Sequence, residues 1–286
     1  MVNESEHIQH LKDKLLVMLP TRSRPQGFRR ALDSYLQNRA HPRSVGSGYG
    51  PWYSDIVMTF QNPEVNNLQP NVCIAKERGL GDRYWLVGDI GFVAKVNFLV
   101  DKYPGYGAYM ILNDDQIIQT KDFDKILMDR LAKKEKESGH RLWILHWKDG
   151  INDEKLCQSF CSDQMLELLG SYYPRRCMRH LYSDNLYHFI GENCKILEYC
   201  PDVFIEHLHF VNKKAEIDGS YEETNSKERY AIDGDAFGRW LLAYGAETCV
   251  KILKKIGYDD LTIQAKEKEI TEIIKQAVKL PEQAAQ

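Results

Sequence analysis

The sequence has no stretch that would carry the chain into or across a membrane. No run approaches the ~20 consecutive apolar residues that a bilayer-spanning helix needs. The polar segment 1–9 also lacks the apolar core of a secretory signal peptide. We therefore expect a cytoplasmic protein without a transmembrane segment.

The cysteines form neither a disulfide framework nor a zinc site. Their number is seven, which is odd, and no two of them make a CxxC pair. Cys157 and Cys161 are four residues apart, but no His or Cys follows them at zinc-ligand spacing. The sequence therefore predicts reduced, mostly buried thiols.

The chain has little excess charge of either sign. Its net charge is −3, so the overall charge gives no reason to expect nucleic-acid binding. The distribution is less even, because Lys and Arg outnumber Asp and Glu in residues 1–50, and a second basic cluster contains Arg175, Arg176 and Arg179. Such clusters either meet phosphates or form ordinary solvated faces.

Size and composition fit a globular α/β enzyme. The chain has 286 residues, with 43% hydrophobic and 28% charged. Strands are predicted over residues 15–19, 55–60, 72–75, 108–112, 142–147 and 203–209. Helices are predicted over residues 26–37, 92–100, 120–136, 164–169 and 184–190, and loops over 40–54, 78–90 and 149–163. Strands that alternate with helices favour a largely parallel sheet flanked by helices.

The pattern changes near Asp233. Phe237, Trp240, Leu241 and Tyr244 recur at helical spacing, and residues 260–280 read as a charged, amphipathic helix. We therefore expect an α/β domain over 1–232 and a C-terminal helical appendage over 233–286 that packs on it.

An acidic cluster follows one apolar run directly. Residues 108–112 are apolar, and Asn113, Asp114 and Asp115 come next. In an open α/β sheet, ligands bind at the carboxyl ends of the strands. Carboxylate oxygens there suit Mg²⁺ or Mn²⁺ with a phosphate attached. The alternative interpretation is an ordinary turn that follows a strand.

The motifs also stand in an informative order along the chain. A strand ends in the polar segment 20–25, and a helix carries the residues 94–97. The acidic cluster 113–115, the segment 182–185 and the strand 203–209 follow in that order. This order resembles the inverting family 2 nucleotide-sugar glycosyltransferases of the GT-A fold, over about residues 14–210. The Glu-His-x-His strand followed by Lys214 and Ala215 is similar to phage-encoded members.

The resemblance implies roles for individual residues. It places the nucleotide sugar on Thr21, Arg22, Arg24, Lys95, Asn97, Asn113 and Asp114. It assigns the divalent metal, Mn²⁺ or Mg²⁺, to Asp115 with His207 or His209, which share one face of their strand. It makes Asp184 the general base. Asn113 departs from the family's Asp-x-Asp motif.

Each of these residues has a plainer interpretation. Asp184 could be a helix N-cap, and His207 and His209 could be core histidines. Arg22 and Arg24 could be surface cations on a loop. The order of the motifs, rather than any single residue, supports the functional interpretation.

The predicted function is transfer of a sugar from a nucleoside diphosphate, with UDP as the expected nucleotide, to an acceptor hydroxyl. The acceptor is predicted to be a hydroxymethylated pyrimidine of phage DNA, with Arg175, Arg176 and Arg179 on its phosphates. The location would then be the host cytoplasm. The alternatives are a glycan acceptor, an inactive sugar-nucleotide-binding module, a nucleotidyltransferase and a Rossmann oxidoreductase. The sequence gives no oligomeric state.

Overall fold

The computed structural model describes residues 11–22, 24–40, 44–45, 48–49, 53–61, 69–151, 156, 158–175, 177–209, 212–214 and 219–279. A mixed eight-stranded sheet lies at the centre, in the order β5-β4-β1-β6-β9-β8-β10-β7. Its strands are β1 (Leu15–Thr21), β4 (Ser54–Gln61), β5 (Tyr84–Val87), β6 (Ala108–Ile111), β7 (Gln116–Ile118), β8 (Ile144–Lys148), β9 (Phe160–Ser162) and β10 (Leu197–His207). The hairpin strands β2 (Ser44–Val45) and β3 (Gly48–Tyr49) form a separate pair.

Most neighbouring strands run parallel. β1 is parallel to both β4 and β6, β4 to β5, and β8 to β10. β9 is antiparallel to β6 and β8, and β7 is antiparallel to β10. The predicted α/β class with a mostly parallel sheet is confirmed. Parallel strands bring their carboxyl ends to one edge of a sheet, where a pocket can form.

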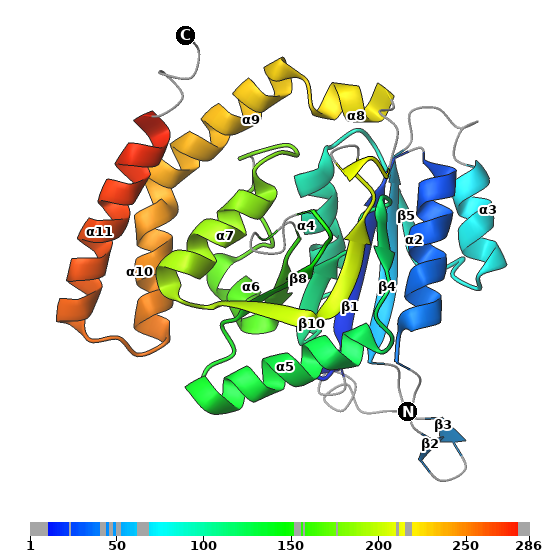
Figure 1. The fold of residues 1–286 in the computed structure, drawn as a ribbon, viewed down its shortest axis with the longest axis horizontal. Coiled ribbons are helices and arrows are strands. Elements are labelled where there is room, and N and C mark those ends of the chain that lie inside the picture. Colours follow the sequence, from blue (N-terminus) through cyan, green and yellow to red (C-terminus); the bar gives the residue numbers. More distant parts are fainter. Residues whose placement is uncertain are drawn as a thin grey trace.

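Helices cover both faces of the sheet (Figure 1). They are α2 (Pro25–Asn38), α3 (Gln69–Glu77), α4 (Phe92–Lys102), α5 (Phe123–Ser138), α6 (Asp163–Leu169) and α7 (Ser183–Cys194). Alternate residues of β1 serve the two faces. Leu15 and Val17 belong to the core that includes Phe28 of α2, whereas Leu16 and Met18 belong to the core that includes Val96 of α4.

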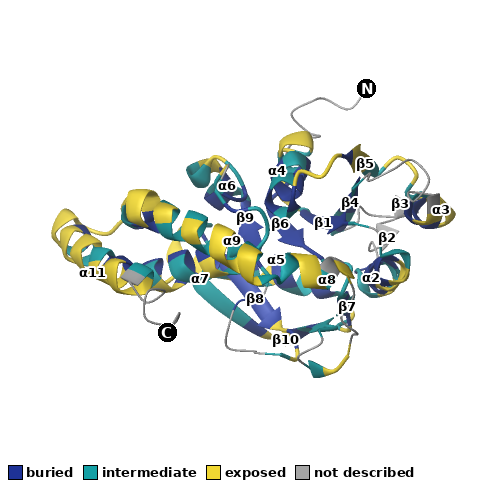
Figure 2. Ribbon diagram, turned by 90° about the horizontal axis from the view of Figure 1, so that it is seen from above, coloured by how far each residue is buried: buried dark blue, intermediate teal, exposed yellow. Residues whose placement is uncertain are grey.

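The C-terminal helices are α8 (Gly219–Thr224), α9 (Lys227–Trp240), the π-helix η3 (Leu241–Gly245), α10 (Ala246–Lys255) and α11 (Asp260–Lys279). Residues of α9, η3, α10 and α11 belong to a hydrophobic core that also includes residues of the sheet. Ile252 of α10 and Ile270 of α11 share one buried cluster with Leu186 and Ile190 of α7. Figure 2 shows buried strands in the middle and exposed outer faces on α9 and α11. The predicted boundary at residue 233 falls inside α9; the division into two domains stays a prediction.

Two sequence predictions for local structure are wrong. Residues 72–75, predicted as a strand, lie in helix α3, with Ile74 and Ala75 buried and Cys73 exposed. A short apolar run does not distinguish a strand from one side of a helix. The predicted loop 78–90 contains the edge strand β5, whose Trp85 and Leu86 are exposed. An exposed edge strand of four residues lacks the apolar alternation of a half-buried strand.

Four very short strands were also missed. The sequence analysis did not predict β7 or β9, each of three residues, or β2 and β3, each of two residues within the predicted loop 40–54. The strands predicted over residues 15–19, 55–60, 108–112 and 142–147 are confirmed within a few residues. No helix in the described part of the chain combines the length and apolar content that crossing a bilayer requires.

Candidate functional site

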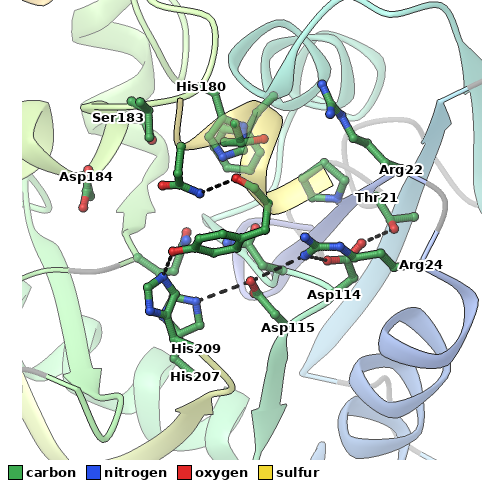
Figure 3. Close-up of a pocket in the computed structure, with 18 of the residues that line it drawn as sticks. Thr21, Arg22, Arg24, Asp114, Asp115, His180, Ser183, Asp184, His207 and His209 are labelled. Atoms are coloured by element: carbon green, nitrogen blue, oxygen red, sulfur yellow. Dashed lines mark hydrogen bonds and ion pairs between the residues drawn. The ribbon is translucent and has the colours of Figure 1, made fainter. Parts of the chain in front are cut away.

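One pocket gathers most of the predicted site residues. It lies at the carboxyl ends of β1, β6 and β10 and has a volume of about 260 Å³ (Figure 3). The predicted residues that line it are Thr21, Arg22, Arg24, Lys95, Asn113, Asp114, Asp115, Asp184, His207 and His209. The pocket is therefore built from segments that lie far apart in the sequence, from Pro20 to Asn225.

Carboxylates after β6 face cations and a hydroxyl after β1. The Thr21 hydroxyl donates a hydrogen bond to Asp114, and an Arg24 guanidinium nitrogen lies 3.6 Å from Asp114 Oδ1. The same nitrogen lies 3.9 Å from Asp115 Oδ2. A Cβ added to Gly27 of α2 would lie 2.5 Å from the Asp114 carbonyl oxygen. Glycine at position 27 thus lets α2 approach the acidic cluster closely.

Asp115 and His207 form the central pair of the pocket. His207 Nε2 lies 3.5 Å from Asp115 Oδ2, and the Leu208 backbone N–H donates to the Asp115 carbonyl at 2.7 Å. Burial acts to raise the pKa of Asp115, but the His207 ring and the Arg24 charge outweigh it and lower the pKa. Burial acts to lower the pKa of His207, but Asp115 outweighs it and raises the pKa.

Helix α8 contributes Tyr221 and Thr224 to the pocket lining. Its Tyr221 hydroxyl shares a hydrogen bond with His209 Nε2, and the two rings have centroids 5.2 Å apart. His209 in turn lies edge-to-face against His207, with ring centroids 5.1 Å apart. His207 faces Asp115, as Figure 3 shows, whereas His209 Nε2 bonds the Tyr221 hydroxyl. Of the two histidines, His207 is therefore the better placed to act together with Asp115.

Two further cations lie in the pocket wall. Arg22 pairs with Glu223 of α8 at 3.1 Å and lies 3.9 Å from Asp89. Lys95 is only 3% exposed, and its Nζ donates to Gln61 Oε1 at 2.8 Å. Burial, aided by the Arg22 charge, lowers the pKa of Lys95 to about 8. An anion in the pocket would therefore meet two cations, of which Lys95 is shielded from solvent.

Asp184 faces the pocket from the first turn of α7. The N-cap of this helix is Tyr182, so Asp184 is not the cap itself, although its Oδ1 accepts from the Asn185 N–H at 3.0 Å. Burial raises the pKa of Asp184 above its ordinary value. A carboxylate with a raised pKa is a stronger base than a free aspartate, so the site offers a proton acceptor here.

The remaining predicted residues lie outside the pocket lining. Asn97 is buried, and both ends of its side-chain amide bond the Tyr173 backbone at 2.9 Å. Arg175 pairs with Asp101, and Arg179 pairs with Asp89. Arg176 lies outside the described residues. The side chain of Asn97 thus bonds the protein backbone. Among the described residues, neither Arg175 nor Arg179 lines the pocket.

The sequence analysis missed several pocket residues, which are Phe92, Gln158, His180, Leu181, Tyr182, Ser183, Tyr221, Thr224 and Asn225. The His180 ring lies tilted against that of Phe92, with ring centroids 5.1 Å apart, and burial lowers the pKa of His180 to about 4. His180 is therefore neutral at physiological pH. Its place directly before the segment 182–185 was a usable signal, whereas nothing in the sequence of α8 indicated that Tyr221 reaches the pocket.

The donor set fits a metal that is shared with a ligand rather than one enclosed by protein. Among the described residues, no group of three or more His, Cys, Asp or Glu side chains is arranged to hold a metal ion. Asp115 Oδ1 is buried and, within the described part of the chain, has no hydrogen-bond partner. Mg²⁺ commonly takes one or two carboxylates together with substrate phosphates and waters. Asp115 and His207 could serve as the protein's part of such a site.

The fold and site define an α/β protein with a polar pocket at the carboxyl ends of its strands. No protein-family model and no curated protein matches the sequence. Among solved structures, TarS from S. aureus matches with a TM-score of 0.47 and 11% identity, over 92% of this chain and 55% of the TarS chain. The chain thus spans about half the length of that TarS structure.

Two further structures match at a similar level. The TarS 1-349 structure from S. aureus has a TM-score of 0.47 and 10% identity, over 94% of this chain and 92% of that chain. A mycobacterial protein has a TM-score of 0.46 and 10% identity, over 91% of this chain and 81% of that chain. At this similarity, substrate and reaction have to be argued from the residues of the pocket.

Proposed function

We propose that the chain is a metal-dependent, inverting glycosyltransferase that uses a nucleoside-diphosphate sugar. The observation that carries the proposal is the pairing of Asp115 with His207 beside Arg24, in one pocket with Asp184. This combination supplies a cation site for a diphosphate and a base for an acceptor. Together with the order of the motifs along the chain, it favours glycosyl transfer over the other nucleotide chemistries.

The diphosphate would bind on the side of the pocket that carries Arg22, Arg24 and Lys95. Guanidinium groups bind phosphate oxygens through charge-assisted hydrogen bonds. Asp114 accepts from Thr21, which fixes its carboxylate beside the expected ribose position. UDP is the proposed nucleotide because it is the commonest in the family that the sequence resembles.

Asp115 and His207 would hold the divalent ion, Mn²⁺ or Mg²⁺, together with the diphosphate oxygens. When bound, the ion would neutralise the negative charge that develops on the leaving phosphate. The Arg24 guanidinium would share that task and would keep the two adjacent carboxylates from repelling each other.

Asp184 would accept the proton of the acceptor hydroxyl as that oxygen attacks the anomeric carbon. The new bond forms between the acceptor oxygen and the sugar carbon, and the bond to the nucleoside diphosphate breaks. Burial raises the pKa of Asp184 and so strengthens it as a base. A single base with attack from the side opposite the leaving group gives inversion at the anomeric carbon.

For the acceptor, we propose a hydroxymethylated pyrimidine of phage DNA, with a surface glycan as the competing acceptor. Arg175 and Arg179 would meet the DNA phosphates, but each is paired with an aspartate, Asp101 or Asp89. These pairs would have to exchange for phosphate contacts on DNA binding. Activity on DNA should therefore fall steeply as salt rises, whereas activity on a neutral glycan should change little.

The test is release of the nucleotide from a panel of UDP- and GDP-sugars, with Mn²⁺ or EDTA, with and without hydroxymethylated DNA. The test variant is Asp115→Asn, which should lose the release. Its matched control is Asp129→Asn, which changes an exposed aspartate on α5. The proposal expects metal-dependent release in the wild type and in this control, and stimulation by the acceptor. Donor binding without release under any condition would indicate an inactive binding module, and absence of both would refute the proposed function.

A further inference from the structure

The C-terminal helix α9 contacts a segment of the pocket wall through one buried carboxylate. Asp233 is 1% exposed and accepts hydrogen bonds from three consecutive backbone N–H groups. Asp233 Oδ1 lies 3.1 Å from the nitrogen of Arg179, and Oδ2 lies 2.9 Å from those of His180 and Leu181. Buried backbone N–H groups without a partner are costly, so the carboxylate fixes the path of this segment.

The segment that Asp233 holds leads directly into the proposed catalytic residue. His180, Leu181, Tyr182, Ser183 and Asp184 all line the pocket. Tyr182 lies in the left-handed region with φ 64° and is the N-cap of α7, so the chain turns sharply between Leu181 and Asp184. A shift of residues 179–181 would therefore be passed on to the first turn of α7.

Other contacts hold the same segment between two helices. The Tyr182 ring stacks on Phe237 of α9, with centroids 5.6 Å apart. A Cβ on Gly234 would lie 3.1 Å from the Tyr182 hydroxyl oxygen, so α9 approaches this ring closely. On the other side, the Val93 N–H of α4 donates to the Arg179 carbonyl at 3.1 Å.

We propose that Asp233 is a positioning residue, which acts through the 179–181 backbone to set the place of Asp184 in the pocket. The inference rests on the proposed function, because it concerns the placement of the proposed base. Helix α9 would then contribute to turnover, because its Asp233 accepts from three backbone N–H groups in the segment before α7. The donor-side residues Arg24 and Asp115 come from other elements and would keep their places.

The test compares Asp233→Asn and Asp233→Ala with Asp235→Asn, a change of an exposed aspartate two residues along α9. Hydrogen exchange of the amides of Arg179, His180 and Leu181 is the direct readout. We expect faster exchange in both Asp233 variants, more so for Ala, because Asn keeps one acceptor oxygen. Exchange in Asp235→Asn should equal that of the wild type.

Kinetics then separate positioning from mere stability. A displacement of about 1 Å at a catalytic group can cost about 100-fold in rate. We expect kcat to fall about 10- to 100-fold in Asp233→Asn, at a temperature where the variant is fully folded. KM and the calorimetric Kd for the donor should stay within about twofold of the wild type, because the proposed donor ligands Arg24 and Asp115 lie on other elements than α9 and the 179–181 segment. A change in stability alone would leave kcat of the folded enzyme unchanged.

Two results would overturn the inference. The first is unchanged protection of the 179–181 amides in both Asp233 variants. The second is faster exchange with wild-type kcat, which would make the contact structural only. If the wild type itself released no nucleotide from any donor, the proposed function would fail, while the exchange data would still decide whether Asp233 holds the segment.

Discussion

Asp115 and Asp184 face the same pocket, but their surroundings shift their pKa values in opposite directions. Asp115 lies beside His207 and Arg24, whose charges outweigh the effect of burial and lower its pKa. Asp184 has no cation within ion-pair distance among the described residues, and burial raises its pKa. The same residue type therefore offers a permanent anion on one side of the pocket and a proton acceptor on the other.

This difference suits the two sides of the pocket to different proposed tasks. Carboxylates whose environments push their pKa values apart commonly act as stabiliser and acid or base. The side formed after β1 and β6 is crowded with charge and suits a diphosphate with its metal. The side formed by the 180–184 segment contains the neutral His180 and Asp184, whose Oδ1 accepts a hydrogen bond from the Asn185 N–H. With its raised pKa, Asp184 makes this side suited to proton transfer.

The largest expected effect is on the charged side. Asp115→Asn would remove the carboxylate that faces His207 and Arg24, and with it the proposed metal site. Loss of several kcal/mol of transition-state stabilisation corresponds to a fall in kcat/KM of about 1,000-fold. Steady-state nucleotide release with Mn²⁺ measures it, and near-wild-type turnover in this variant would remove Asp115 from the mechanism.

The next effect is on the opposite side. Asp184→Asn keeps an oxygen for the Asn185 N–H but removes the base, so we expect kcat to fall about 100-fold with donor affinity unchanged. In the wild type, kcat should fall as the pH drops through the pKa of Asp184, at a pH above the ordinary aspartate value of about 3.9. A pH–rate profile of the wild type tests this. If the variant retained the rate and the acid limb, another group would be the base.

A smaller effect is expected from the backbone beneath the acidic cluster. Gly27→Ala would bring a Cβ to 2.5 Å from the Asp114 carbonyl oxygen, so the cluster or α2 has to shift. Overpacking of this kind costs about 1–3 kcal/mol, and we expect donor Kd to rise about tenfold. Calorimetry with the donor measures it. Gly238→Ala is the control, because its Cβ would make only ordinary contacts with Val278, and equal binding in both variants would contradict the interpretation.

The smallest predicted effect is on stability: the Asp184→Asn change that lowers activity should stabilise the folded protein. A carboxyl group whose pKa is raised by folding stabilises the protein below its unfolded pKa, and this contribution is lost as the pH rises through the folded pKa. Asp184 is thus a cost at neutral pH, and Asp184→Asn should raise the free energy of unfolding by about 1 kcal/mol at pH 7. Urea denaturation measures it. The gain should disappear near pH 3, and a destabilised variant at pH 7 would contradict the assignment.

The sequence predicted the sheet and the charged side of the pocket better than the opposite side. The strands over 15–19 and 108–112 are fully buried, so their apolar runs are unbroken, and polar residues at their ends mark the pocket edge. Thr21, Arg24, Asp114 and Asp115 therefore lie where their positions after strands predict. The predictions for short elements failed because the edge strand β5 and helix α3 are too short to show a clear hydrophobic pattern.

Contacts between segments far apart in the chain could not be predicted from the sequence. Tyr221 reaches His209 only because α8 returns to the sheet, and Asp233 meets residues 179–181 only because α9 packs against the segment that precedes α7. Neither contact has a local signature, since it depends on tertiary packing rather than on spacing. Asn97 shows that a motif position does not fix a side chain's contacts: the motif suggested the nucleotide, whereas in the fold its amide bonds the Tyr173 backbone.

The most direct measurement is calorimetric binding of UDP and GDP, with Mn²⁺ and with EDTA, to the wild type, Asp115→Asn and Asp184→Asn. The account predicts that one nucleotide binds the wild type only with Mn²⁺, that Asp115→Asn loses this binding, and that Asp184→Asn retains it. Metal-independent binding that is equal in all three proteins, or no binding of either nucleotide, would contradict the division of the pocket into a diphosphate side and a proton-transfer side.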